Sequence, residues 1–259
     1  MSVEEWKEAV VLFSRTWGAS LSRFSTILTF RSVAKFGLPA VTEQVLKEST
    51  HIAHELFNDP RYDNLFKDKN GVIELLGGLD RVIEEMTKKK IKIFHYSIDA
   101  ASLIFAHSIL DGVALEYCRT TALASPSSWE GFVSLKQIKL QDIRGSTYDN
   151  ILRMKIDEHL QALERESLKT KIDRLFAVCH PPAGFAPIDG YGFDGDRLDT
   201  LDSNRHEIVH GQGQTNPLPG GDDDIWFLMQ TSNYLMLMVN LRYDLKIDPM
   251  STISGFKPN

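Results

Sequence analysis

The residues best suited to chemistry lie in one short segment, Asn204 to Gly211, which reads Asn-Arg-His-Glu-Ile-Val-His-Gly. Within it Arg205 and His210 are five positions apart, between two glycine-rich stretches. An arginine can stabilise the extra negative charge of a pentacoordinate phosphorane, and a histidine can move the proton of a 2′-hydroxyl or of a leaving oxygen. The segment therefore suits phosphodiester chemistry by a route that requires no metal ion.

The spacing alone is not distinctive, because two further arginine and histidine pairs have similar spacing: Arg153 with His159, and Arg174 with His180. The neighbouring residues separate the three pairs. Only Arg205 is followed by a polar residue, His206, and only His210 is followed by glycine. Positions five apart lie about 140° apart around an ideal helix, whereas positions four apart share a face. We therefore expect His206 and His210 to lie together, with Arg205 reaching them through its long side chain or a distorted helix end.

The segment resembles the signature of the HEPN superfamily (higher eukaryote and prokaryote nucleotide-binding domains). In that superfamily a short helix late in an α-helical bundle carries Arg, a polar residue, a few further positions and then His, often followed by Gly. The resemblance covers residues 91–245, including a long apolar helix at each end of that range. By position, Arg205 and His210 would be the catalytic pair, and His206 would stand where Asn is commonest in the family.

The resemblance implies a metal-independent endoribonuclease that leaves a 2′,3′-cyclic phosphate. Many such proteins belong to toxin–antitoxin or anti-phage systems, so RNA is the expected substrate and a cognate antitoxin or regulatory protein a further partner. It also implies a homodimer in which two motifs face one cleft. Some HEPN proteins are catalytically silent, which leaves a second interpretation: a non-catalytic HEPN-like module that binds a partner protein, a nucleotide or RNA.

Three of the polar residues on the long apolar segment 94–123 are candidates for a site: His107, Asp111 and Glu116. In one interpretation they bind substrate opposite the Arg205 segment. In the other, His107 is a buried histidine held by a carboxylate.

Other combinations of polar residues are less informative. His51, His54 and Glu55 do not form the His-Glu-x-x-His pattern of zinc proteases, so we expect an exposed helix face and no metal site. The glycine-rich stretches lack the phosphate-binding glycine motifs, so no cofactor is expected. The basic residues available to guide an RNA backbone are the run 88–92 and the scattered Lys136, Lys139 and Arg144.

Apolar residues recur at helical spacing through most of the chain, and strand-like alternation is scarce. We predict an all-α fold, which the resemblance makes a HEPN-like antiparallel helical bundle. The Thr87–Lys92 run, with four lysines, predicts a boundary between an N-terminal helical extension (1–90) and the HEPN-like domain (91–245), with a C-terminal tail (246–259). The expected helices are 4–36 with a break near Gly18, 39–57 beginning at Pro39, 71–86, 94–123, 149–163, 168–179, 196–210 and 222–245.

Helix 94–123 carries Ile98, Ala101, Phe105, Ile109 and Val113 on one stripe, and its other faces are also apolar, which favours burial in a bundle or a subunit interface.

The chain has 29 basic and 35 acidic residues, which excludes a surface that is cationic throughout. Two cysteines, 61 positions apart, do not form a disulfide scaffold, and no uncharged apolar run long enough for a membrane span is present. The acidic first residues do not resemble a signal peptide. We therefore expect a cytoplasmic protein that does not contact a membrane.

Overall fold

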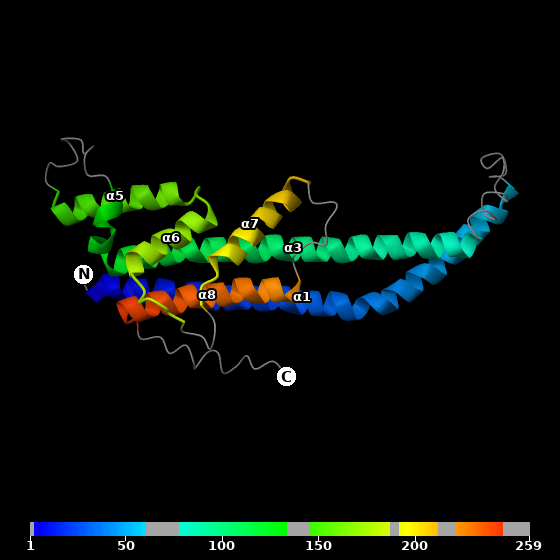
Figure 1. Ribbon diagram of the computed structural model, residues 1–259, viewed down its shortest axis with the longest axis horizontal. Helices are drawn as coiled ribbons and strands as arrows, with labels where there is room; N and C mark the ends of the chain where they lie inside the picture. Colours follow the sequence, from blue (N-terminus) through cyan, green and yellow to red (C-terminus); the bar gives the residue numbers. More distant parts are fainter. Residues whose placement is uncertain (1–2, 61–77, 134–145, 187–191, 212–220, 246–259) are drawn as a thin grey trace. The chain divides into compact units, whose positions relative to one another are not determined.

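The computed structural model describes residues 3–60, 78–133, 146–186, 192–211 and 221–245, and within them every regular element is helical. This confirms the all-α prediction. The elements are α1 (Val3–Asn58), α3 (Leu79–Ala124), the 3-10 helix η2 (Pro126–Phe132), α5 (Tyr148–Leu163), α6 (Leu168–Cys179), α7 (Gly195–Val209) and α8 (Asp222–Tyr243), shown in Figure 1.

The chain forms two compact units, one comprising residues 1–26 and 103–259 and the other residues 27–102. We call the first the bundle unit and the second the hairpin unit. Helices α1 and α3 each contribute one part to the bundle unit and one part to the hairpin unit. The predicted boundary at residue 91 therefore does not coincide with either edge of these units.

The hairpin unit is an antiparallel pair made from the end of α1 and the start of α3. Arg31 lies 2.8 Å from Asp99, and His54 Nε2 lies 2.7 Å from Asp80 Oδ1. Because the later residue of α1 pairs with the earlier residue of α3, the two helices run in opposite directions. Leu38 and Ile83 are among the few apolar side chains that this unit buries.

The first 26 residues belong to the bundle unit and not to the hairpin unit, although they lie within the predicted extension 1–90. Apolar residues of α1 at a spacing of four or seven face inward: Ala9, Phe13, Trp17 and Phe24 are all buried. The Phe13 ring lies 5.4 Å from the Tyr117 ring of α3, between centroids. On another side, the Ser20 hydroxyl hydrogen-bonds to Ser232 of α8 at 3.1 Å.

Three predicted helix breaks are absent, because α1 continues through Gly18 and Pro39 and α3 continues through the lysine run 88–92. A glycine inside a helix costs about 1 kcal/mol, and a proline removes one backbone hydrogen bond. The neighbouring Trp17 and Leu38 are buried, and such packing offsets these local costs. Lysine is a good helix former, and the run keeps its charged side chains exposed.

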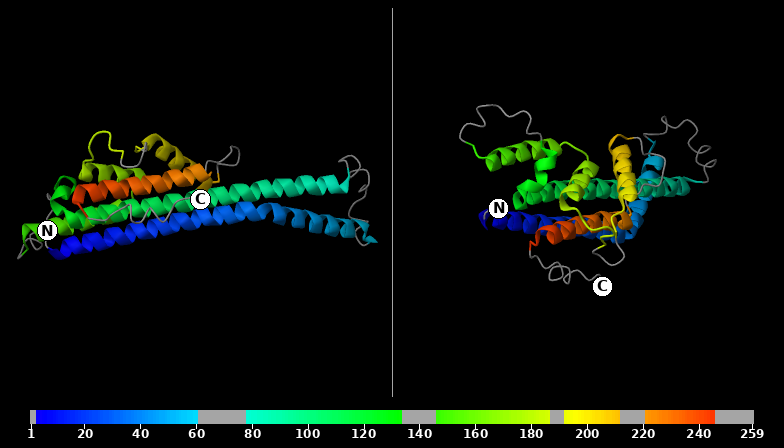
Figure 2. Two further views of the ribbon diagram at one scale, coloured as in Figure 1. Left: turned by 90° about the horizontal axis from the view of Figure 1, so that it is seen from below. Right: turned by 60° about the vertical axis from the view of Figure 1, so that its left-hand side comes forward.

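Helix α3 lies at the centre of the bundle unit, with α1 and α8 on one side and α5, α6 and α7 on another (Figures 1 and 2). Its buried residues in this unit include Leu103, Leu110 and Tyr117. Phe105, which was predicted on the buried stripe, is 64% exposed, since the buried face contains Leu103 and His107 instead. Helix α3 contains an 18-residue stretch that is long and apolar enough to cross a membrane. Half of that stretch is buried inside the protein, and core helices that do not contact a membrane have the same composition.

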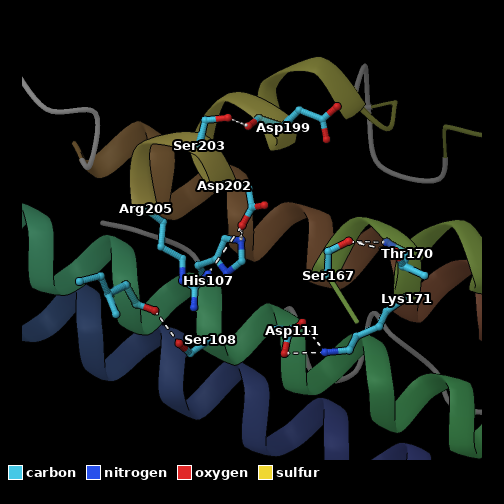
Figure 3. Close-up of polar contacts among 11 residues, drawn as sticks. His107, Ser108, Asp111, Ser167, Thr170, Lys171, Asp199, Asp202, Ser203 and Arg205 are labelled. Atoms are coloured by element: carbon cyan, nitrogen blue, oxygen red, sulfur yellow. Dashed lines mark hydrogen bonds and ion pairs between the residues drawn. The ribbon is translucent and has the colours of Figure 1, made fainter. Parts of the chain in front are cut away.

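An ion pair between a buried lysine and a partly exposed aspartate joins α6 to α3. The Lys171 side chain is 2% exposed, and its Nζ donates to both carboxylate oxygens of Asp111 at 2.7 and 2.8 Å (Figure 3). A buried ammonium without a counter-ion is strongly unfavourable, so this contact fixes how α6 lies on α3.

We expect Lys171→Met to lower the free energy of unfolding by about 2 kcal/mol. Breaking a fully buried ion pair costs ~3–5 kcal/mol, but the cost is lower here because Asp111 is 36% exposed and can be hydrated. Urea denaturation measures the change. The matched control is Lys169→Met, which removes an exposed contact with Asp199 and should leave the midpoint unchanged. The double variant Lys171→Met/Asp111→Leu should recover most of the loss; a double variant as unstable as the single one would contradict this explanation.

Candidate functional site

The beginning of α7 is attached to α8. Asp194 caps the helix, its Oδ1 accepting from the backbone N–H of Arg197 at 2.9 Å. The Arg197 guanidinium then donates to Asp224 at 2.9 Å and lies 4.6 Å above the ring of Phe227. These contacts fix the orientation of α7 on α8 and thereby the position of the Arg205–His210 segment.

Arg205 occupies a position that faces the interior of the bundle unit. It continues the stripe of Leu198 and Leu201, both buried, which ends with the half-buried Ile208. This 3-4-3 spacing places all four side chains on one face of α7. The Arg205 side chain is 38% exposed, while its Nε is buried and has no hydrogen-bond partner among the described residues.

The inward face of α7 meets α3 at a cluster of three polar residues (Figure 3). His107, whose side chain is 3% exposed, places Nε2 2.9 Å from Asp202 Oδ1. The same oxygen of Asp202 lies 3.8 Å from Arg205 Nη1. A buried histidine, a half-exposed carboxylate and a guanidinium therefore adjoin one another, and Asp202 is the residue between the two bases.

His206 and His210 lie on the outer side of α7. Both are exposed, and their ring centroids are 4.2 Å apart, which agrees with the prediction from their spacing of four. The helix ends at Val209, and Gly211 adopts a φ of +71° while its N–H donates to the carbonyl of Ile208 at 3.2 Å. Within the described part of the chain, neither imidazole pairs with a carboxylate.

The motif is therefore divided between two faces of one helix end. Arg205 groups with His107 and Asp202, and His206 groups with His210. In the ranges that the structure describes, no hydrogen bond or ion pair joins Arg205 to His210. This separation is what a spacing of five predicts for a regular helix, and a phosphate would contact both only if the Arg205 side chain turned outward.

The other two predicted substrate-binding residues lie in different contacts. Asp111, which was considered as the partner of His107, binds Lys171 instead, and Asp202 takes its place beside His107. Glu116 pairs with Arg119, which also reaches Glu164. Both carboxylates are therefore engaged in contacts of α3 with itself and its neighbours, away from α7.

Sequence reasoning missed Asp202 as part of the site. A signal was present, because Asp202 lies three residues before Arg205 and so shares its helix face. What the sequence did not provide was the position of His107 on the opposing helix.

Metal sites and basic surface add little to this cluster. No group of three or more His, Cys, Asp or Glu side chains in the described ranges is arranged to hold a metal ion. His54 contacts Asp80, and His51 contacts Glu55 of the same helix. Of the predicted basic patches, the 88–92 run lies on α3 in the hairpin unit, and Lys136, Lys139 and Arg144 lie outside the described residues.

Comparison of the chain with protein-family models, with curated proteins and with solved structures gives no match. The resemblance to HEPN proteins accordingly depends on the Arg205–His210 segment and its neighbouring helices, and it stays a prediction.

Burial lowers the pKa of His107 below its ordinary 6.5; Asp202 opposes this shift and Arg205 adds to it. The pKa of His159 is also lowered, first by burial and then by Arg174. In both cases the unfolded chain binds protons more readily than the folded chain, so stability is lost as the pH falls below about 7.

We expect His107→Gln and His159→Gln each to reduce the dependence of the unfolding temperature on pH in this interval, and the double variant to reduce it further. Thermal unfolding followed by circular dichroism at several pH values measures the slope. A His107→Gln variant with the slope of the wild type would show that His107 is not held in its neutral form.

Proposed function

We propose that this chain is a metal-independent endoribonuclease of HEPN type. The observation that carries the proposal is the exposed pair of imidazoles, His206 and His210, on the same helix end as the guanidinium of Arg205. Imidazoles that do not pair with carboxylates can accept protons from a bound substrate and donate protons to it. The guanidinium can meet the charge that develops on phosphorus.

In the proposed reaction the 2′-oxygen of a ribose attacks the adjacent phosphorus as the bond from phosphorus to the 5′-oxygen breaks. His210 takes the proton of the 2′-hydroxyl or gives one to the leaving 5′-oxygen, and the second proton transfer uses the imidazole of His206, solvent, or the motif of a second copy. The products are a 2′,3′-cyclic phosphate and a 5′-hydroxyl. DNA lacks the attacking oxygen and is not a substrate.

Arg205 must turn outward to take part. Its guanidinium is 3.8 Å from Asp202, which is long for an ion pair, and the side chain is 38% exposed. Half-exposed ion pairs of this kind contribute less than about 1 kcal/mol to the stability of the fold. A phosphate, which arginine binds through two parallel hydrogen bonds, can therefore compete with Asp202 for the guanidinium.

A second function is favoured by one specific observation, the inward position of Arg205. If its role is to hold α7 on α3, the chain is a non-catalytic helical module that binds a partner protein, a nucleotide or RNA. The charge of α7 is consistent with this alternative, because four carboxylates accompany its two arginines. In the enzyme, a second copy would supply the positive charge that α7 lacks.

The proposal includes a homodimer in the cytoplasm, acting in a toxin–antitoxin or anti-phage system with an antitoxin or regulatory partner. Val209 supports the dimer, because it is 56% exposed directly before His210. An apolar side chain beside the candidate site is a natural contact for a second copy, which would bring two motifs to one cleft.

We expect the purified protein to cleave RNA in the presence of EDTA. Arg205→Ala should lower the rate about 100-fold or more, and His210→Ala by a similar factor, because one removes stabilisation of the phosphorane and the other a proton-transfer group. Gel analysis of labelled RNA with end-group identification provides the measurement, and the wild type should yield 2′,3′-cyclic phosphate ends. Arg165→Ala and His51→Ala, which change exposed residues elsewhere, are the matched controls.

Two outcomes would decide against the enzyme. A folded wild-type protein that leaves single-stranded and structured RNA intact at high concentration would favour the binding module. Equal cleavage by the wild type and both site variants would assign the activity to a contaminant or to another site.

We expect the protein to sediment as a dimer at micromolar concentration, and Val209→Asp to shift it toward the monomer with loss of RNA cleavage. Analytical ultracentrifugation measures the mass. Val11→Asp, which changes an exposed valine of α1, is the control and should stay dimeric. A wild-type monomer that cleaves RNA would show that one motif is sufficient.

A further inference from the structure

One carboxylate oxygen on α7 faces two donors from different helices. Asp202 Oδ1 lies 2.9 Å from His107 Nε2 and 3.8 Å from Arg205 Nη1. The shorter distance is a close ion-pair contact and the longer one is near the limit of such a contact, and neither ring nitrogen of His107 makes a hydrogen bond of normal geometry among the described residues. Asp202 therefore lies closer to the buried histidine of α3 than to the arginine of its own helix (Figure 3).

The surroundings of His107 favour a neutral ring that donates through Nε2. Its side chain is 3% exposed, which opposes protonation, and the charged groups that face it are few. Asp202 and Arg205 approach from α7 with opposite charges, and Asp111 on α3 is engaged by Lys171 of α6. A neutral imidazole carries one N–H, and Nε2 is the ring nitrogen that lies 2.9 Å from the carboxylate, so a hydrogen on Nε2 is the one placed nearest to Asp202.

We propose that His107 is a positioning residue: its buried N–H holds the Asp202 carboxylate, and this keeps the Arg205 guanidinium available for a phosphate group. Asp202 and Arg205 are three residues apart on one helix, a spacing at which opposite charges pair readily. Without the donor on α3, Asp202 can turn fully to Arg205 and compete with the phosphate. The inference rests on the proposed function only in taking an RNA phosphate as the ligand of Arg205.

The geometry predicts a distinct pattern for four variants. His107→Leu removes the donor, so Asp202 captures Arg205 and RNA binding weakens. His107→Gln places an amide N–H near the position of Nε2 and should behave as the wild type does. Asp202→Asn removes the competing charge and should bind RNA at least as tightly as the wild type. The double variant His107→Leu/Asp202→Asn should regain the binding lost in His107→Leu.

The probe is a 2′-O-methyl RNA oligonucleotide, which cannot be cleaved, and fluorescence anisotropy gives its dissociation constant. We expect His107→Leu to raise the dissociation constant about fivefold, which is the effect of losing the binding contribution of one half-exposed ion pair. The constant of His107→Gln should stay within about twofold of the wild type. On a cleavable RNA, His107→Leu should raise KM and change kcat little. Wild-type affinity in His107→Leu, or no recovery in the double variant, would overturn the proposal.

A second readout does not depend on RNA. Exchange of the Arg205 Nε proton with water, measured by ¹⁵N NMR, should slow in His107→Leu and keep the wild-type rate in His107→Gln. If the wild type neither binds nor cleaves RNA, the proposed function fails, while slower exchange in His107→Leu alone would still support the positioning role. Unchanged exchange would reject it. If His107→Leu does not fold, the surface variant Asp202→Asn decides: faster exchange supports the proposal and unchanged exchange rejects it.

Discussion

The candidate site depends on the contact between His107 of α3 and Asp202 of α7. Helix α7 has only two fully buried side chains, Leu198 and Leu201, and both lie in its first two turns. Beyond them the helix is fastened to the bundle unit by the half-buried Ile208 and by this polar contact, at 2.9 Å from a histidine that is almost fully buried. An imidazole buried at that depth requires a partner, since an unpaired buried polar group costs about 1–3 kcal/mol. The position of the motif and the protonation of His107 are thus linked.

This linkage explains how an inward arginine and two outward histidines can belong to one site. Arg205 lies on the stripe that packs toward α3, where its guanidinium has one loose contact with Asp202 and an unpartnered Nε among the described residues. His206 and His210 face solvent one turn apart. A phosphate that approaches the helix end would draw Arg205 outward, and the charge of the substrate itself would then assemble the three groups. In the proposed reaction the imidazoles are therefore in place before the substrate binds, and the guanidinium moves to meet it.

Most helices could be predicted from the sequence, because amphipathic segments with clear ends depend on local pattern. α6 begins and ends at the predicted residues 168 and 179, and Gly211 adopts the left-handed conformation expected after the end of a helix. Pro39, Gly18 and the lysine run do not interrupt their helices, although local rules predict breaks at these residues, because packing over more than 40 residues keeps α1 and α3 continuous. The proximity of His206 and His210 followed from their spacing alone, whereas their exposure did not. The pairing of His107 with Asp202, and of Asp111 with Lys171, did not, because it depends on which helices meet.

If RNA binds at the end of α7, as we propose, ring NMR of the histidines should detect it. The protein has eight histidines, which ¹³C-labelled ring signals can distinguish once single His→Gln variants assign them. On addition of a non-cleavable 2′-O-methyl RNA, we expect the signals of His206 and His210 to shift together and that of His107 to respond more weakly through Asp202. The signals of His51 and His54 in the hairpin unit should not respond. Shifts confined to the hairpin unit, or no shift at saturating RNA, would contradict this proposal.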